Sequence, residues 1–376
     1  MISPERLCHT LRAAGIDFYT GVPDSLLKNL CAWLTDHADD RHHIIAANEG
    51  GAIGLAAGHY LATGQIPLVY MQNSGEGNAV NPLLSLTDKE VYRIPVLLVI
   101  GWRGEPSIHD EPQHKKQGQV TVPLLDAMGI RHEVLTTDDH ELDAQIDRAV
   151  THMRTTGEAF ALIVRKSTFE SYQLRHTVAD QSTLSREEAI RIAASTMPRE
   201  AIAVSTTGKI SRELFEYRAA MGEGHERDFL TVGSMGHASQ IALGIALAQP
   251  TRPVYCFDGD GAVIMHMGAL GIIGNMQPHN FRHIVFNNGV HDSVGGQPTV
   301  GYRIDLPAIA RACGYKTVLT TDNADTLRQL LDDISHAEGP VFVEVRVRKG
   351  ARADLGRPTT TPIENKEALM RFLQQR

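Results

Sequence analysis

Two stretches of this 376-residue sequence lie 182 residues apart and begin alike, and this repeat restricts the possible folds more than any other feature. Ser3, followed by a Pro-Glu pair, is typical of a helix start, and a short strand is expected at 17–20. Ser185 forms a capping box with Glu188, and the helix that follows leads to a strand expected at 201–205. The sequence therefore predicts two halves built on one plan.

The repeat continues beyond these openings. Each half next contains a helix rich in glycine and alanine, followed by an apolar strand at 68–71 or 254–257. The glycines after these strands, Gly77 and Gly261, are 184 residues apart, so the register holds. Strands that alternate with helices predict parallel sheets covered on both faces. We therefore expect an α/β protein with two doubly wound parallel-sheet domains.

The domain limits follow from a polar stretch without helical periodicity, which runs from Gln173 to Ser185. We place the domains at 1–175 and 186–376 and the linker at 176–185. In doubly wound sheets, ligands bind at the carboxyl ends of the strands. The functional residues are therefore expected at those ends.

Composition excludes several classes of function. The net charge of −8, from 36 basic and 44 acidic residues, argues against binding to nucleic acid or to an anionic membrane. Any site for an anion must therefore be local. The four cysteines are scattered without a CxxC pair, which argues against a zinc site, an iron-sulfur cluster or a disulfide framework. No segment reaches the roughly 18 uninterrupted apolar residues of a membrane span, and no signal peptide is visible. We expect a cytoplasmic protein.

The apolar strand expected at 253–257 is followed at once by Gly259, Asp260 and Gly261. We expect this segment to form a phosphate loop, because glycines let backbone amides approach an anion closely. A carboxylate among those amides would repel the anion unless a divalent cation lay between the two. Asp260 therefore indicates a site for Mg2+.

A second strand, at 284–286, ends in Asn287 and Asn288, which offer neutral oxygen ligands at the same edge of the sheet. For Asn287, an ordinary turn asparagine is an equally good interpretation. An EF-hand loop is excluded, because Ala262 stands where an oxygen ligand is needed and Val263 where the turn glycine is needed.

The Gly-Asp-Gly motif, a gap of 25 residues and the Asn-Asn pair together resemble the diphosphate and metal motif of thiamine diphosphate enzymes. The resemblance implies that Asp260, Asn288 and the backbone carbonyl of Val290 hold Mg2+. It further implies that the first domain binds the pyrimidine and the second the diphosphate, in a homodimer or higher oligomer with sites between subunits. The expected contacts to the cofactor in the second domain are Thr207, Gly208, Gly233, Ser234, Met235, Gly259, Asp260, Gly261, Ala262 and Asn288.

Glu49 precedes the glycine-rich helix of the first half and matches the glutamate of the family's pyrimidine-binding domain. A carboxylate at the far pyrimidine nitrogen favours the tautomer that removes the thiazolium proton. The alternative is a first-turn glutamate that complements the helix dipole. For Met235, a core methionine is the alternative to a bulky residue under the cofactor. Ser234 and the glycines near it could be plain turn residues.

Three blocks, which begin at Gly21, Met71 and Asn287, closely resemble the phosphonopyruvate decarboxylase family, and the resemblance covers nearly the whole chain. Positive and histidine side chains also gather after the strand expected at 96–100, as a substrate with a carboxylate and a phosphonate would require. The candidate substrate residues are Arg103, His109, His114 and Lys115. Lys115 and Lys116 are more typical of solvated surface, so Arg103 is the strongest candidate.

The resemblance implies decarboxylation of phosphonopyruvate to phosphonoacetaldehyde and CO2 in phosphonate biosynthesis. Sulfopyruvate decarboxylase shares the motifs and is the nearest alternative. A noncatalytic cofactor-binding protein is disfavoured by the presence of Glu49, and a transketolase-type carboligase has no use for the charged loop.

Candidate proton carriers are His291, Asp292, His109 and Asp24, which the sequence does not rank. His291 and Asp292 could equally well cap a turn. One residue departs from the family pattern. Glu76 stands where an apolar residue is expected, and an extra carboxylate near an anionic substrate is unfavourable unless it points away.

Overall fold

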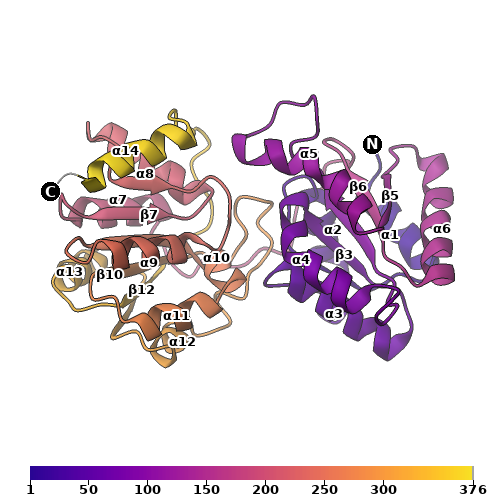
Figure 1. The fold of residues 1–376 in the computed structure, drawn as a ribbon, viewed down its shortest axis with the longest axis horizontal. Coiled ribbons are helices and arrows are strands. Elements are labelled where there is room, and N and C mark those ends of the chain that lie inside the picture. The colour runs from indigo at the N-terminus through magenta and orange to yellow at the C-terminus, as the bar shows by residue number, and fades with distance from the viewer. Residues whose placement is uncertain (375–376) are drawn as a thin grey trace. The chain divides into compact units, whose positions relative to one another are not determined.

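The computed structural model describes residues 1–374 and divides into two compact units. The first contains residues 1–177 with 291–298, and the second contains 178–290 with the chain from 299 onward. Each unit has a six-stranded parallel sheet with helices on both faces (Figure 1), which confirms the predicted fold class. The sequence did not indicate that 291–298 would belong with the first unit. Among the described residues, no helix is long and apolar enough to cross a membrane.

The sheet of the first unit has the strand order β2-β1-β3-β4-β6-β5. Strands β4 and β6 are buried along their whole length, as expected for central strands covered on both faces. The six strands are β1 (Tyr19–Gly21), β2 (His43–Ile45), β3 (Leu68–Gln72), β4 (Leu97–Gly101), β5 (Arg131–Val134) and β6 (Phe160–Val164).

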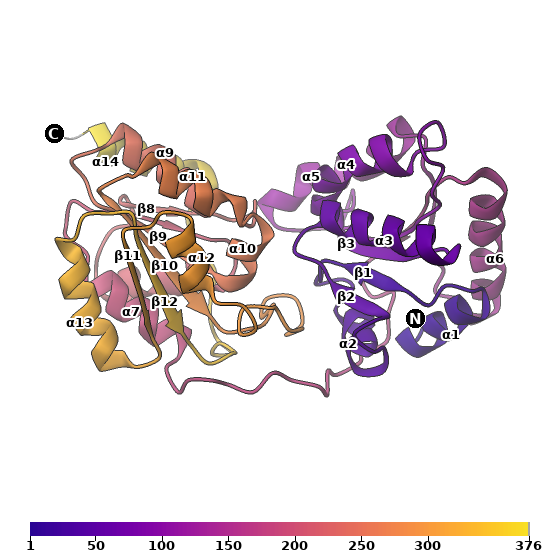
Figure 2. The same ribbon diagram turned by 90° about the horizontal axis from the view of Figure 1, so that it is seen from below.

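Two apolar layers cover this sheet, one on each face (Figure 2). One layer comes from α1 (Pro4–Ala13), α2 (Lys28–His37) and α6 (Asp139–Thr156). The other comes from α3 (Glu49–Thr63), α4 (Glu76–Pro82), the π-helical turn η2 (Leu83–Thr87) and α5 (Pro112–Ala127); the 3-10 turn η1 (Asn73–Gly75) leads into α4. Ser3 caps α1 by accepting a hydrogen bond from the Arg6 N–H, as the sequence predicted.

The second unit has the strand order β11-β12-β10-β9-β7-β8. Its strands are β7 (Ile202–Ser205), β8 (Asp228–Leu230), β9 (Val254–Gly259), β10 (Phe281–Asn287), β11 (Thr317–Thr321) and β12 (Val341–Arg346). Helices α7 (Arg186–Thr196), α8 (Lys209–Ala220) and α13 (Ala324–Ser335) cover one face. Helices α9 (Ala238–Ala248), α11 (Gly268–Met276), α12 (Leu306–Ala312) and α14 (Pro362–Gln374) cover the other, and α10 (Asp260–Met265) follows β9.

The two sheets have the same topology. If the strands of each unit are numbered in chain order, both sheets read 2-1-3-4-6-5 from one edge to the other. The duplication expected from the sequence is therefore present in the fold. In both sheets the first and third strands are neighbours, and the chain reverses its direction of winding there. Such a switch point opens a crevice for ligands at the carboxyl ends of the strands.

The structure differs from the sequence-based expectation at the Gly-Asp-Gly motif. No loop separates strand from helix, because β9 continues through Gly259 and α10 begins at Asp260. The chain between 173 and 184 forms neither helix nor strand, and Ser185 caps α7 by accepting from the Glu188 N–H.

Candidate active site

Glu49 is the first residue of α3, immediately after the helix cap Asn48, and only 5% of its surface is exposed. Its Oε2 accepts a hydrogen bond from Asn78 Nδ2 at 2.7 Å. Its carboxyl group also lies against Gly75, where an added Cβ atom would come within 3.0 Å of Oε1. Glu49 is therefore a first-turn glutamate whose orientation is fixed by two residues of the next segment, Gly75 and Asn78. Neither Gly75 nor Asn78 was predicted, although both follow the end of β3.

Asp24 lies at the switch point of the first sheet, beyond the end of β1, and its side chain is fully buried. Its Oδ1 accepts from Gln72 Nε2 at 2.5 Å and its Oδ2 from the Leu26 N–H at 2.9 Å. Burial raises the pKa of Asp24, and the hydrogen bond from Gln72 is the largest of the opposing effects. Gln72 was not predicted, although it ends β3.

Arg103 follows β4 and is tied to two other side chains of the first unit. Its Nε donates to Asp110 Oδ2 at 2.8 Å, its Nη2 donates to Asp110 Oδ1, and its Nη1 donates to Ser25 Oγ at 2.7 Å. The bond to Asp110 raises the pKa of Arg103. Burial acts to raise the pKa of Asp110, but Arg103 and two backbone N–H groups outweigh it and hold that pKa below its ordinary value. The predicted cation, Arg103, is therefore already paired with Asp110, which was not predicted.

The other predicted substrate residues lie on the same segment. His109 precedes Asp110 and is exposed, His114 lies half-buried in the first turn of α5, and Lys115 is exposed beside it. Helix α5 packs tightly on the turn at Gly104, since an added Cβ there would come within 3.0 Å of the His114 carbonyl. The turn after β4 thus carries Arg103 and holds the start of α5 in place.

Glu76 is buried, with 3% of its surface exposed. It lies on the same face of α4 and η2 as Ala79 and Leu83, which belong to one of the two apolar layers on the first sheet. Among the described residues, Glu76 Oε1 has no hydrogen-bond partner. Burial raises its pKa from the ordinary value of 4.5 to about 8. The extra carboxylate of the sequence analysis is thus an acid in the apolar layer, uncharged at neutral pH.

Asp260 is the corresponding acid of the second unit. It begins α10 with 2% of its surface exposed, and Thr299 Oγ1 donates a hydrogen bond to its Oδ2. Burial raises its pKa to about 6, against the opposing effects of Thr299 and backbone N–H groups. Gly301 lies beside it, where an added Cβ would come within 3.0 Å of both Asp260 Oδ2 and Asn287 Oδ1.

The two asparagines after β10 have different partners. Asn287 Nδ2 donates to the Gly301 carbonyl and to Glu344 Oε1, both at 2.8 Å, so Asn287 ties the strand end to its neighbours. Asn288 Oδ1 accepts from the Val290 N–H at 3.2 Å. Asn287 is therefore more than a turn residue, and Asn288 contacts the backbone of Val290 through its side-chain oxygen. Thr299, Gly301 and Glu344 were not predicted.

The remaining predicted cofactor residues all lie at carboxyl ends of strands in the second unit. Thr207 and Gly208 follow β7, and Gly208 has a positive φ of 99° just before α8. The residues Gly233, Ser234 and Met235 lie between β8 and α9. The next glycine, Gly236, lies against the ring of His266, where no Cβ would fit. Gly259 ends β9, and Gly261 and Ala262 form the first turn of α10.

His291 belongs to the first unit, with the rest of 291–298. Its backbone closes a turn, because its N–H donates to the Gln297 carbonyl and its carbonyl accepts from Val294 and Gly296. Burial lowers the pKa of its side chain to about 4. The turn interpretation thus describes its backbone, and its imidazole is neutral at physiological pH.

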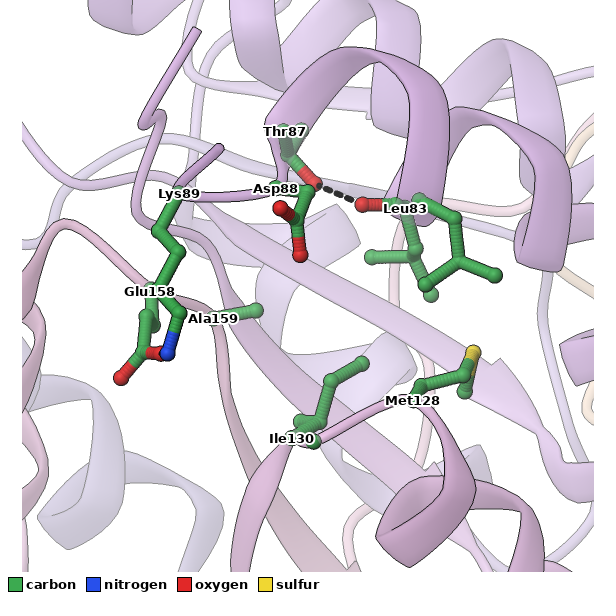
Figure 3. Close-up of a pocket in the computed structure, with 10 residues that line it drawn as sticks. Leu83, Thr87, Asp88, Lys89, Met128, Ile130, Glu158 and Ala159 are labelled. Atoms are coloured by element: carbon green, nitrogen blue, oxygen red, sulfur yellow. Dashed lines mark hydrogen bonds and ion pairs between the residues drawn. The ribbon is translucent and has the colours of Figure 1, made fainter. Parts of the chain in front are cut away.

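A cavity of about 90 Å3 in the first unit is lined by none of the predicted site residues (Figure 3). Residues that precede β5 and β6, among them Ile130 and Ala159, line it, so it opens at the amino ends of the strands. Lys89 and Glu158 form an ion pair at its wall. This cavity is at the wrong edge of the sheet for the predicted chemistry.

The polar residues at the carboxyl ends of the strands suit a charged cofactor that carries a diphosphate. A buried carboxylate with a raised pKa gains from a nearby cation, and only a glycine at 301 leaves room for the Asp260 carboxyl group. In the first unit, Glu49 presents a buried carboxylate with one fixed orientation. The residues present therefore fit thiamine diphosphate with a divalent metal ion.

Comparison with known proteins gives the same class. Residues 4–133 match the thiamine pyrophosphate enzyme N-terminal TPP binding domain, and residues 206–345 match the thiamine pyrophosphate enzyme C-terminal TPP binding domain. The fold and the site thus define a thiamine diphosphate-dependent enzyme.

Whole-length relatives narrow this class. The chain is 36% identical to a phosphonopyruvate decarboxylase of Streptomyces viridochromogenes, over 97% of this chain and 93% of that protein. It is 33% identical to one of Streptomyces hygroscopicus, over 97% and 92% respectively. A sulfopyruvate decarboxylase of Methanosarcina acetivorans is 25% identical over 99% and 97%. The chain belongs to the phosphonopyruvate decarboxylase family of thiamine diphosphate-dependent 2-oxoacid decarboxylases, which are carbon-carbon lyases.

Proposed function

We propose that the protein converts phosphonopyruvate to phosphonoacetaldehyde and CO2, with thiamine diphosphate and Mg2+, as a step of phosphonate biosynthesis. The observation that carries the proposal is the buried Glu49, held by Asn78 and by the close approach of Gly75 in a pyrimidine-binding domain. The phosphonate substrate is supported by the two Streptomyces relatives.

When bound, thiamine diphosphate supplies the carbon nucleophile and the electron sink that decarboxylation of a 2-oxoacid needs. Glu49 would hold the pyrimidine and stabilise its protonated form, because a fixed, buried carboxylate is a strong hydrogen-bond acceptor. Asp24 and His291 would move protons, Asp24 from a buried carboxyl group with a raised pKa and His291 from a neutral imidazole.

Asp260, Asn288 and the Val290 carbonyl would hold Mg2+ and, through it, the diphosphate. Their support is the burial of Asp260 and the contact between Asn288 and Val290. Gly233, Ser234, Thr207 and Gly208 would contact the diphosphate from the neighbouring strand ends, and Met235 would pack against the cofactor.

Arg103 would bind the phosphonate. Three of its five N–H groups are used by Asp110 and Ser25, which leaves two for a substrate oxyanion. Because Asp110 offsets its charge, further positive charge is needed for a dianion. His109, His114 and Lys115 on the same segment would supply it.

We further propose a cytoplasmic homodimer, or a higher homo-oligomer, with each site shared between subunits. The four free cysteines fit a reducing compartment. Exposed apolar residues on α9 and α11, namely Leu247, Ile272 and Met276, fit a buried subunit contact.

A parallel assay tests the substrate. Purified protein with Mg2+ and thiamine diphosphate is given phosphonopyruvate, sulfopyruvate or pyruvate, and CO2 release is followed. We expect the highest kcat/KM for phosphonopyruvate. A higher value for sulfopyruvate would support the second candidate, which the Methanosarcina relative favours. Equal rates on all three would contradict a site built for an anionic tail.

A further inference from the structure

The Asp24 carboxylate lies in a space that three strands of the first sheet leave for it. Gln72 ends β3 and Gly101 ends β4, and the two residues are direct partners in the sheet. A Cβ atom at Gly101 would come within 3.0 Å of Asp24 Oδ2, so only glycine leaves room for the carboxyl group. Gln72 Nε2 contacts the other oxygen, Oδ1. The carboxylate is therefore confined on both sides.

The orientation of the Gln72 amide is also fixed. Its Oε1 accepts a hydrogen bond from Ser74 Oγ at 2.7 Å. With its carbonyl oxygen bonded to Ser74, the amide presents its nitrogen to Asp24. A carboxylate oxygen that accepts from an amide N–H keeps its negative charge more easily than one that does not. Ser74 thus directs Gln72, and Gln72 directs Asp24.

We propose that Gln72 is a positioning residue that holds the Asp24 carboxyl group in one orientation and keeps it able to take up and return a proton during turnover. The inference rests on the proposed function, in which Asp24 carries a proton. It concerns a residue of the first unit that contacts Asp24 and has no other part in the proposed site.

Among the groups around Asp24, Gln72 is the one that can set its ionisation. Arg103 lowers the pKa of Asp24 by its positive charge, but Asp110 already offsets that charge. Cys31, on α2, is the other buried titratable neighbour, and burial raises its pKa so far that it stays a neutral thiol. Of the groups that lower the pKa of Asp24, the Gln72 hydrogen bond has the largest effect.

The test compares pH–rate profiles of the holoenzyme. Asp24→Asn first identifies which limb of the kcat profile belongs to Asp24, because that limb disappears. Gln72→Leu removes the donor and should move the same limb to higher pH by about one unit or more, the usual effect of a lost hydrogen bond to a charged group. Ser74→Ala, which frees the amide to turn over, should give a smaller shift in the same direction. Gln65→Leu, at an exposed position before β3, is the matched control and should leave the profile unchanged.

A second readout does not depend on turnover. In protein labelled with 13C at aspartate carboxyl groups, the Asp24 signal is the one absent from Asp24→Asn, and its titration should move to higher pH in Gln72→Leu. If Gln72→Leu lowers kcat equally at every pH and leaves that titration in place, Gln72 has only a structural role and the inference is wrong. If Asp24→Asn is fully active, the proton-carrying role of Asp24 in the proposed function fails. The NMR titration still reports whether Gln72 sets the ionisation of Asp24.

Discussion

The carboxyl group of Glu49 lies so close to the backbone of Gly75 that no side chain fits at position 75. Gly75→Ala should therefore push Glu49 out of place, and a displacement of about 1 Å at a catalytic group can cost roughly 100-fold in rate. We expect kcat to fall by about that factor. Gly77→Ala is the matched control, because a Cβ there meets no atom within 4 Å. Equal kcat values for the two variants would show that the position of Glu49 does not matter.

Glu49→Gln should still bind thiamine diphosphate but turn over slowly, since an amide cannot stabilise a protonated pyrimidine as a carboxylate does. General acid–base contributions of this kind are worth about 100- to 10,000-fold. Exchange of the cofactor's thiazolium proton, followed by quenched-flow NMR, measures the effect directly. Exchange at the wild-type rate would assign the role to another carboxylate.

Asp260→Ala should abolish the Mg2+ dependence of cofactor binding. The diphosphate would then face only backbone dipoles and neutral side chains. Calorimetric titration of thiamine diphosphate with and without Mg2+ measures this. Asp325→Ala removes an exposed carboxylate of the same unit and should bind as the wild type does. If Asp260→Ala binds thiamine diphosphate with unchanged affinity and Mg2+ dependence, Asp260 is not a ligand of the metal.

Arg103→Ala should lower kcat/KM for phosphonopyruvate. The expected loss of transition-state stabilisation is about 2 to 4 kcal/mol, the scale for loss of one partner of a desolvated charge pair. Activity on pyruvate, which has a methyl group in place of the phosphonomethyl group, should hardly change. Arg103→Lys should recover only part of the loss, because an ammonium group cannot form the paired contact. Equal losses on both substrates would mean that Arg103 supports the fold or binds the shared carboxylate. Arg148→Ala, at an exposed ion pair, serves as the control.

Glu76→Leu should stabilise the protein above pH 8. The folded protein holds the Glu76 proton up to about pH 8, whereas the unfolded chain releases it near 4.5. The folded state therefore binds more protons between these values, and the free energy of unfolding falls as pH rises through that window. At about 1.4 kcal/mol per pKa unit, the full loss is at most roughly 4 to 5 kcal/mol.

Thermal unfolding from pH 5 to 9 measures this loss. The wild type should lose stability across the window, and Glu76→Leu should lose less. Glu90→Leu, at an exposed position of the same unit, should follow the wild type. Parallel curves for wild type and Glu76→Leu would show that Glu76 ionises freely in the folded state.

Much of the fold was readable from the sequence because its signals are local. The caps at Ser3 and Ser185 and the apolar strands are set by neighbouring residues, and they repeat in both halves. The Gly-Asp-Gly segment was wrongly expected to form a loop. Asp260 instead starts a helix directly, since an acidic residue is favourable in a first helical turn.

The partners of the site residues could not be read in this way. Gln72 and Asp24 are 48 positions apart, and Asp260 meets Thr299 across 39 positions. Such contacts depend on which strands become neighbours, and no periodicity in the chain encodes that order. Asp110 is the exception. It is only seven residues from Arg103, and an acidic residue so near a cation that follows a strand could have been selected from the sequence.

The shared 2-1-3-4-6-5 topology has an evolutionary consequence. Once a duplicated scaffold supplied two equivalent switch points, substitutions at one edge no longer had to serve the other, so the copies were free to specialise. In the proposed function, one copy has an amide at the end of its third strand, Gln72, that orients a proton carrier. The other copy has an acid directly after its third strand, Asp260, that holds a metal ion. If Arg103 binds the substrate as proposed, a change of substrate needs changes only in the turn after β4, while the residues around Asp260 in the second copy can stay the same.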